Sequence, residues 1–214
     1  MYSFAQRNDV KVLDEPFYAY YLKNINPELD HPGKKEILDS QSSNLKTVVE
    51  EIVILKQQYG CVFVKNMTHH LRGIDFSFAG DWHNIILTRD PRRAIISFSK
   101  VISNPTMDDL GYKLQYDLAN FFTSKKINFK VISSENLLKN PKEVLSDVCE
   151  FSKMKFNPQM LSWRKGGIVE DGVWAKHWYQ NVESSTGFIP FVEKKNHVPA
   201  KYSNILAECM DVYR

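Results

Sequence analysis

The sequence predicts an α/β fold in which layers of helices flank a parallel sheet. Short apolar runs, bounded by polar residues, alternate along the chain with segments whose apolar residues recur at helical spacing. Such runs are typical of strands buried on both faces, and the connections between them are expected to be right-handed helical crossovers. The length of 214 residues fits a single domain over residues 1–214.

The first elements are a helix end and a short strand. Met1–Arg7 has the pattern of the last turns of a helix, with no capping residue ahead of it. Val10–Asp14 fits a strand, and Pro16 ends it because proline cannot donate to a sheet. Asp14 and Glu15 thus stand as two carboxylates at the carboxyl end of a strand. They could be catalytic, or they could form a solvated loop.

Aromatic and polar segments follow. Phe17–Leu22 is rich in aromatic residues, which could line a pocket for an apolar or sugar-like acceptor or pack under a loop. Asn24–Ser43 holds two prolines and many polar residues, so we expect a mobile excursion with little regular structure, which could act as a substrate lid. Leu45–Tyr59 has the spacing of an amphipathic helix, and Gly60 stops it.

The next expected strand, Cys61–Lys65, ends in a lysine, and the loop after it holds His69 and His70. In a parallel sheet, ligands bind at the carboxyl ends of the strands, so these three side chains lie on the expected functional edge. Adjacent histidines do not share a helical face as metal ligands at i and i+4 would. The three cysteines also lack metal-ligand spacing, so we expect free thiols and no metal site.

A strand-to-helix junction is predicted in the sequence NIILTRDPRRAIISFS, residues 84–99. Asn84–Thr88 fits a buried strand, after which Asp90 can cap a helix whose first residue is Pro91. The start of that helix is strongly basic. Backbone N–H groups, the positive end of the helix dipole and guanidinium groups would converge there, as in a phosphate or sulfate site.

The residues that supply this anion site are Arg89, Arg92 and Arg93, and the Ser97 hydroxyl could reach the same anion. A solvated basic helix start is the alternative, because charge clusters at helix ends are common. Further along, we expect a helix over Met107–Lys125.

The remaining elements continue the alternation. They are a strand at Phe129–Ser133, a helix that begins at Pro141 and a final helix from about Lys201. Between the last two helices, Ser162–Phe191 has neither helical nor strand period, so a structured loop is expected.

In this loop, Arg164, Lys165 and Gly166 could place cationic groups and backbone N–H groups against a phosphate. The alternative is a surface flap anchored by Trp174 and Trp178. The aromatic surface could also be buried in a homodimer.

Composition narrows the class of function. The chain has 28 basic and 25 acidic residues, and its net charge of +3 is too small to indicate nucleic-acid binding. Hydrophobic residues at 43% and charged residues at 25% are ordinary for a globular protein. No stretch of about twenty apolar residues and no signal-peptide pattern occur. We therefore expect no membrane segment and a cytoplasmic location.

Three motifs, in this order, resemble the sulfotransferases that use 3′-phosphoadenosine 5′-phosphosulfate (PAPS). The buried strand followed by Arg-Asp-Pro, with a serine eight residues after the arginine, resembles their 3′-phosphate-binding element. The segment SSENLLKNPKEVLSDVCEFSKMKFNP resembles the stretch after a later strand of the superfamily. Arg164-Lys165-Gly166 resembles their Arg-Lys-Gly loop, and Asp171–Ala175 is similar to the bacterial sulfotransferase-like subgroup.

The resemblance implies a three-layer parallel sheet of the P-loop nucleoside triphosphate hydrolase and sulfotransferase type. It further implies transfer of a sulfuryl group from PAPS to a hydroxyl or amine of a small molecule or sugar. Arg89 and Ser97 would hold the 3′-phosphate, and Arg164, Lys165 and Gly166 would close over it.

The resemblance also assigns the reacting groups. Lys65 would neutralise charge on the bridging oxygen. The general base would be Glu15, His69 or His70, with a slight preference for Glu15, since a base tuned by burial beside a cation suits this role. No metal is required.

The chain departs from the family pattern at its front. The first strand and the loop that cradles the 5′-phosphosulfate have no counterpart, so the domain is expected to be N-terminally incomplete. Either the sequence begins late or the element is lost. A late start is favoured, because a sheet without an inner strand would expose unpaired backbone groups.

Two classes of function follow. One is a sulfotransferase, and the other is a non-catalytic relative that binds a nucleotide or 3′-phosphate but has lost the sulfate-holding loop. A P-loop kinase is disfavoured because no GxxxxGK[ST] sequence occurs.

Overall fold

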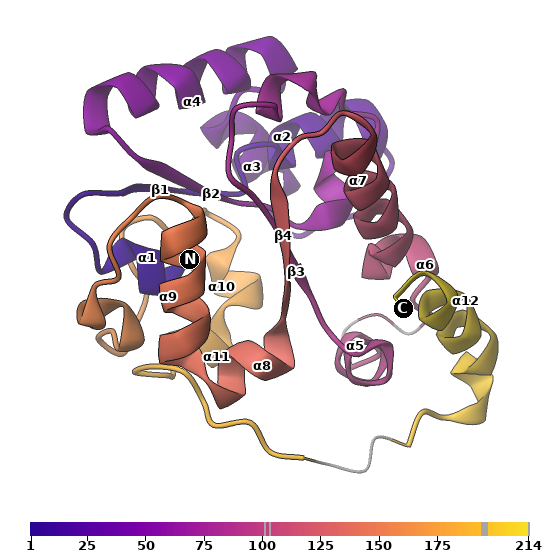
Figure 1. Cartoon of the computed structure of the whole chain (residues 1–214). Helices are drawn as coiled ribbons and strands as arrows, with labels where there is room; N and C mark the ends of the chain where they lie inside the picture. Colours follow the sequence, from indigo (N-terminus) through magenta and orange to yellow (C-terminus); the bar gives the residue numbers. More distant parts are fainter. Residues whose placement is uncertain (101, 103, 194–196, 214) are drawn as a thin grey trace. The chain divides into compact units, whose positions relative to one another are not determined.

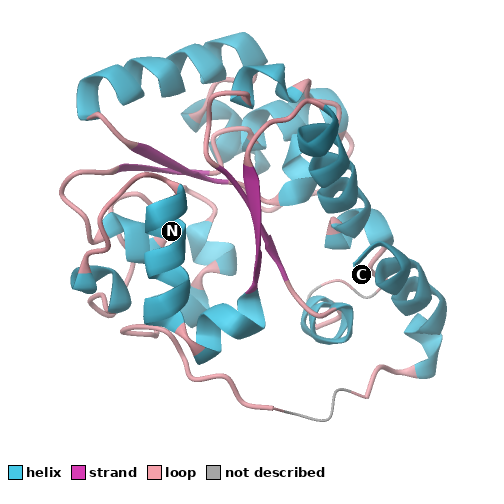
Figure 2. Cartoon of the chain, viewed as in Figure 1, coloured by secondary structure: helices cyan, strands magenta, loops and turns pink. Residues whose placement is uncertain are grey.

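The structure is a computed structural model that describes residues 1–100, 102, 104–193 and 197–213 (Figures 1 and 2). The chain packs as two compact units. Unit 1 comprises Met1–Ile74 and Asn157–Ile189, and unit 2 comprises Asp75–Phe156 and Pro190–Arg214. The single domain expected over residues 1–214 stays a prediction, and each unit is described by itself. None of the described helices is long and apolar enough to cross a membrane.

Unit 1 contains a parallel pair of strands, β1 (Lys11–Asp14) and β2 (Val62–Lys65). Helix α4 (Leu45–Tyr59) connects them and packs on both. Its start is capped by the Asn44 side chain, which accepts a hydrogen bond from Thr47 N at 3.1 Å. Its end is set by Gly60, whose φ of 78° suits glycine. The predicted strand, helix and parallel crossover are confirmed.

The other helices of unit 1 are short. They are α1 (Tyr2–Ala5), α2 (Tyr18–Tyr20), a π-helical turn (Tyr21–Ile25), α3 (Lys34–Ser40), 3₁₀ turns at Thr68–Leu71 and Pro158–Leu161, α10 (Ala175–Trp178) and α11 (Gln180–Glu183). The prediction of little regular structure over 24–43 is wrong for α3, because Ile37 is fully buried and anchors that helix. Likewise, the loop over 162–191 contains the two short helices α10 and α11.

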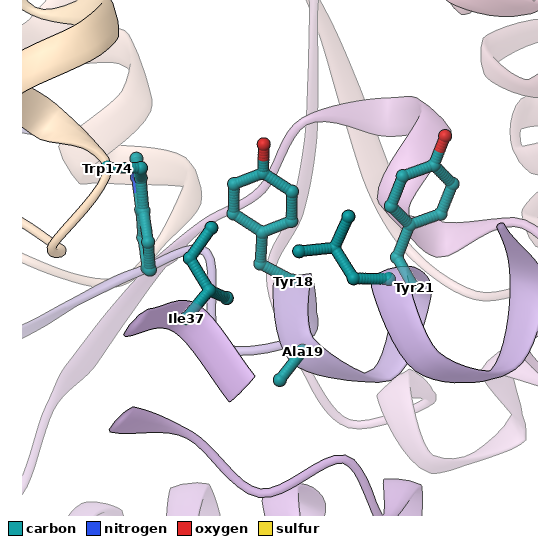
Figure 3. Close-up of a cluster of buried hydrophobic side chains, with 6 residues drawn as sticks. Tyr18, Ala19, Tyr21, Ile37 and Trp174 are labelled. Atoms are coloured by element: carbon teal, nitrogen blue, oxygen red, sulfur yellow. The ribbon is translucent and has the colours of Figure 1, made fainter. Parts of the chain in front are cut away.

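The core of unit 1 contains an aromatic cluster. Figure 3 shows Tyr18, Ala19, Tyr21 and Ile37 gathered beside Trp174, all of them buried. The aromatic residues after Pro16 therefore pack in the core, as one of the two interpretations of the sequence expected. This packing fixes the segment that follows β1.

Unit 2 contains the second parallel pair, β3 (Asn84–Thr88) and β4 (Phe129–Ser133), in register over five residues. The strand bounds agree with those predicted. The helical elements of unit 2 are a 3₁₀ turn at Phe76–Ala79, α5 (Pro91–Phe98), α6 (Met107–Leu110), α7 (Tyr112–Ser124), α8 (Ser134–Lys139), α9 (Pro141–Phe151), a 3₁₀ turn at Ala200–Tyr202 and α12 (Ser203–Tyr213).

The single helix predicted over 107–125 is split in two. Gly111 has a φ of 75°, a left-handed conformation that ends α6 and starts α7. Thr106 and Asp109 form a capping box on α6, which makes it a separate helix. The predicted start of α9 at Pro141 and of α5 at Pro91 is confirmed.

Candidate functional site

The parallel pairing of β1 and β2 brings charged residues together in unit 1. Asp14 is the register partner of Lys65, so Glu15 follows directly at the same end of the strand pair. The carboxyl ends of parallel strands are the usual place for ligands in α/β folds. Of the predicted catalytic residues, the structure places Lys65 and His70 each in contact with Glu15.

Glu15 has an unusual backbone. Its φ is 45°, in the left-handed region that non-glycine residues rarely occupy. The conformation is held by hydrogen bonds: Glu15 N donates to Lys65 O at 2.7 Å, and Glu15 O accepts from Tyr18 N at 3.0 Å and Gln41 Nε2 at 3.1 Å. Backbone strain of this kind is common at functional sites.

The Glu15 side chain is 4% exposed and lies between the Lys65 ammonium and the His70 imidazole. Its Oε1 contacts Lys65 Nζ, and its Oε2 lies 2.9 Å from His70 Nδ1. Burial raises the pKa of Glu15, but His70 and Lys65 outweigh burial and hold the pKa at about 2. Glu15 is therefore ionised at neutral pH, and the solvated-loop alternative is wrong.

Asp14 is buried on the other side of Lys65, with a side chain only 1% exposed. Its Oδ2 accepts hydrogen bonds from Gly172 N at 3.1 Å and from the Tyr179 hydroxyl at 2.9 Å. Burial raises the pKa of Asp14, and the nearby Lys65 charge opposes this effect. The close approach of Gly172 requires glycine, because an added Cβ would lie 2.1 Å from the Trp174 ring.

Lys65 is enclosed by acceptors. Its Nζ contacts Glu15 Oε1, lies 2.6 Å from the Tyr179 hydroxyl and 3.4 Å from Asp14 Oδ1, and its side chain is 24% exposed. An ammonium has three hydrogens, so these three groups can engage all of them. Lys65 keeps one partly exposed side, but it must release one of these partners before it can donate a hydrogen bond to a bound anion.

The two histidines differ in their surroundings. The His70 ring stacks on Tyr18, with centroids 3.9 Å apart, and tilts against Tyr21. Its Nδ1 has no well-aligned hydrogen-bond acceptor among the described residues, so its contact with Glu15 is an ion contact when the ring is protonated. His69 packs edge-on against Tyr21 and His70. Only His70 is placed directly against the predicted base.

The predicted phosphate loop is also in unit 1. Arg164 and Lys165 are exposed, and Gly166 has a φ of 113° and donates its N–H to Glu183 O at 2.7 Å. Asp171 orders the loop, because its Oδ2 accepts from Ile168 N and from the Tyr2 hydroxyl. The loop thus presents two unburied cations on a fixed backbone.

The predicted anion site of unit 2 lies at the start of α5. Asp90 caps the helix by accepting from Arg92 N at 2.7 Å, and it also pairs with the Arg92 guanidinium. Arg89 and Ser97 are exposed. The Arg89 guanidinium forms no hydrogen bond or ion pair with the side chains described in this structure, so it is available to an anion.

Arg93 is held differently from its neighbours. Its Nε lies 3.7 Å from Glu135 Oε1, and its guanidinium lies 4.4 Å from the centroid of the Phe191 ring. Lys139 Nζ is 4.6 Å from the same centroid. Glu135 also accepts from Asp90 N, so it fixes the corner between β3 and α5. Of the three arginines, Arg89 is therefore the one best placed to bind a ligand.

No sequence motif indicates a role for Tyr179 or Glu135. Tyr179 stands 164 residues from Glu15, in a loop whose residues have no regular period, and only its place in an aromatic run marks it. Glu135 stands in the segment that resembles the sulfotransferases, two residues after β4, and was not singled out. Among the described residues, no group of three or more His, Cys, Asp or Glu side chains is placed to hold a metal ion.

The fold is shared with a known sulfotransferase domain. A sulfotransferase domain from the Synechococcus PCC 7002 olefin synthase aligns with 95% of this chain and 93% of its own length, at 14% identity and a TM-score of 0.52. A sulfotransferase domain from the curacin biosynthetic pathway aligns with 91% of this chain and 77% of its own, at 16% identity and a TM-score of 0.49. The first likeness defines the class as a sulfotransferase-type α/β fold.

The family is shown by sequence. A family model described as a sulfotransferase domain matches residues 1–214. The chain therefore belongs to the sulfotransferase family.

Two curated relatives come from Arabidopsis thaliana, branched-chain-amino-acid aminotransferase-like proteins 1 and 2. Each is 31% identical over 218 residues, which cover all of this chain and 38% of the relative. The chain thus spans 38% of the length of these relatives.

Proposed function

We propose that this chain transfers a sulfuryl group from PAPS to a hydroxyl or amine of a small molecule or sugar. One observation carries the proposal: a buried carboxylate, Glu15, and a lysine, Lys65, meet at the carboxyl ends of two parallel strands in a chain of the sulfotransferase family. A proton acceptor beside a fixed cation is what sulfuryl transfer requires.

PAPS supplies the activated sulfuryl group, which leaves adenosine 3′,5′-bisphosphate behind. The acceptor oxygen or nitrogen forms a bond to sulfur while the bond from sulfur to the bridging phosphate oxygen breaks. Glu15 takes the acceptor proton, and Lys65 neutralises the charge that develops on the bridging oxygen. His70 holds the Glu15 carboxylate in place.

The pKa of Glu15 suggests how these roles are coupled. At about 2, the pKa makes Glu15 a weak base while Lys65 and His70 both face it. When Lys65 turns toward an incoming anion, Glu15 loses one of the charges that lower its pKa, and its burial then raises the pKa. Glu15 would become a stronger base only when the donor is present.

We propose one anion site in each unit as a candidate for the 3′-phosphate: Arg89 and Ser97 in unit 2, and Arg164, Lys165 and Gly166 in unit 1. The residues fit the group, since Arg89, Arg164 and Lys165 are exposed cations and guanidinium groups bind phosphate through paired N–H donors. Each unit is tested separately, by Arg89→Ala and by Arg164→Ala.

The test has two stages. Calorimetry with adenosine 3′,5′-bisphosphate measures binding to the wild type, Arg89→Ala, Arg164→Ala and, as a control, Arg72→Ala, which lies outside the proposed site. Transfer from radiolabelled PAPS to a panel of hydroxyl and amine acceptors then measures activity. We expect binding that both site variants weaken and the control retains. Absence of nucleotide binding by the wild type would overturn the proposal.

A second candidate is a non-catalytic protein that binds a nucleotide or 3′-phosphate. The observation in its favour is that Lys65 and Glu15 already satisfy each other, as residues of a structural ion pair do. Nucleotide binding without transfer to any acceptor, under conditions in which a known sulfotransferase is active, would select this candidate.

The remaining proposals concern the cellular location and the binding partners of the protein. A cytoplasmic location is proposed because Cys61, Cys149 and Cys209 form no disulfide in the described part of the chain, as is usual in reducing compartments. We propose a small-molecule acceptor and no nucleic-acid partner. A homodimer through the segment after Ser162 is also proposed, and light scattering would test it.

A further inference from the structure

The Tyr179 hydroxyl lies at the centre of the charged cluster of unit 1. Its oxygen is 2.6 Å from Lys65 Nζ, 2.8 and 2.9 Å from the two Asp14 carboxylate oxygens, and 3.3 Å from Trp174 Nε1. It is also 3.3 Å from Glu15 Oε1. These groups come from β1, from β2 and from the segment around α10 and α11.

Counting hydrogens assigns the direction of each bond. An ammonium and an indole N–H can only donate, so the Tyr179 oxygen accepts from Lys65 and Trp174. The single hydroxyl hydrogen must then go to a carboxylate, and Asp14 is nearer than Glu15. Tyr179 therefore connects the lysine to Asp14 and is itself fully hydrogen-bonded.

The backbone of Tyr179 and the neighbouring Trp174 ring are both held in place. Its N–H donates to Ala175 O at 2.8 Å, and the Trp174 ring beside it is only 2% exposed. The same segment binds Asp14 at a second point, through Gly172 N. The hydroxyl is thus part of a rigid unit rather than of a freely rotating side chain.

We propose that Tyr179 is a positioning residue, which holds the Lys65 ammonium beside Asp14 and Glu15, ready to exchange one of these partners for the transferring sulfuryl group. The inference rests on the proposed function, because it assigns Lys65 its role in transfer. Tyr179 itself acts through Lys65 and Asp14.

The inference predicts a change in how Asp14 titrates. The groups that face Asp14 are Lys65, Glu15, the Tyr179 hydroxyl, Gly172 N and the amino group of Met1. The Tyr179 hydrogen bond lowers the pKa of Asp14, so its removal raises that pKa further. Asp14 then takes a proton at a higher pH, and Lys65 loses a negative partner.

The test compares wild type, Tyr179→Phe and the control Tyr116→Phe, whose ring is 46% exposed on α7. For Tyr179→Phe, we expect kcat to fall on the order of tenfold, the usual effect of losing one hydrogen bond to a charged group. KM for PAPS should stay within about twofold, and the acidic limb of the pH–rate profile should move to higher pH. Tyr116→Phe should match the wild type.

A measurement independent of activity separates this inference from the proposed function. Carboxyl carbon NMR of the full chain follows the Asp14 titration, which should move to higher pH in Tyr179→Phe alone. An unmoved Asp14 titration would overturn the inference, even if kcat falls through lost stability. Absence of transfer by the wild type, with the Asp14 shift present, would instead overturn the proposed function.

If Tyr179→Phe does not fold, 3-fluorotyrosine at position 179 keeps the hydroxyl and the shape of the ring. Fluorine makes the phenol a stronger hydrogen-bond donor, so the Asp14 titration should move to lower pH. A shift in the other direction, or none, would contradict the inference.

Discussion

At the scale of single residues, Glu15 combines a strained backbone with a buried charge. Its left-handed φ turns the chain at the end of β1, and its carboxylate meets Lys65 and His70. The Glu-Pro pair in the sequence indicated a strand end with carboxylates. It could not indicate their burial, because Lys65, His70 and Tyr179, which surround them, come from distant segments.

Glu15 should make stability depend on pH. Its pKa falls from 4.5 to about 2 on folding, so its contribution is present above pH 4.5 and is lost as pH falls through about 2. The contribution of Glu15 to the free energy of unfolding is about 3 kcal/mol. We expect Glu15→Gln to be less stable than wild type at pH 7 and close to it near pH 2, by urea unfolding at each pH.

The matched control is Glu50→Gln, on an exposed i,i+4 pair with Lys46 that should contribute little at any pH. Asp14, whose pKa is raised by burial and by Glu15, acts in the opposite direction. Its pKa falls when Glu15→Gln removes the neighbouring charge, which offsets part of the loss of stability at pH 7. If Glu15→Gln lowered the free energy of unfolding equally at pH 7 and pH 2, the ion pair would not be the source of this stability.

Gly172→Ala is a second test at the residue scale. The new Cβ would overlap the buried Trp174 ring, so the ring must move, and overpacking of this kind usually destabilises by about 1–3 kcal/mol. Because Trp174 donates to Tyr179, transfer activity should fall as well. Gly80→Ala, where an added Cβ meets its nearest atom at an ordinary 3.5 Å, is the control. Thermal melts of both variants test this prediction, and an equal Tm for Gly172→Ala and Gly80→Ala would contradict it.

At the scale of elements, local signals predicted most of the fold. Asn84–Thr88 and Phe129–Ser133 are strands with the predicted bounds, and Asp90 with Pro91 starts α5 as expected. The predictions were wrong where tertiary packing or a single backbone conformation determines whether a helix forms or where it ends. Ile37 makes α3 a helix by entering the core, and Gly111 divides one apolar stripe between α6 and α7.

The α5 cap gives a prediction for this element. Asp90→Ala removes the acceptor of Arg92 N and should destabilise the protein by about 1 kcal/mol. Asp90→Asn keeps a capping oxygen and should be nearly neutral. Chemical unfolding of the two variants tests the cap. An equal loss of unfolding free energy in both would show that the charge of Asp90, and not its capping hydrogen bond, stabilises α5.

At the scale of the whole molecule, the family and the parallel α/β fold were predictable because three short motifs occur in order. The charged cluster around Tyr179 was not predictable from the sequence, because it joins residues more than a hundred positions apart. A sequence pattern records spacing along the chain, whereas this cluster depends on how the segment after Asn157 packs on β1 and β2.

Ligand binding should stabilise the folded chain. At a hundredfold excess over its dissociation constant, adenosine 3′,5′-bisphosphate should add about 2.7 kcal/mol, which raises Tm by roughly 5–10 °C for a protein of this length. Arg89→Ala should lose most of this shift at the same nucleotide concentration. Scanning calorimetry with and without nucleotide measures it, and an undiminished shift in Arg89→Ala would rule out the proposed 3′-phosphate contact.

The enclosure of Lys65 has a consequence for substrate choice. Since its three hydrogens are already engaged, the lysine must exchange partners before it can assist transfer. Contacts with parts of the acceptor remote from the reacting atom can drive that exchange. An acceptor trimmed to its reacting hydroxyl should therefore turn over slowly even when it saturates the protein.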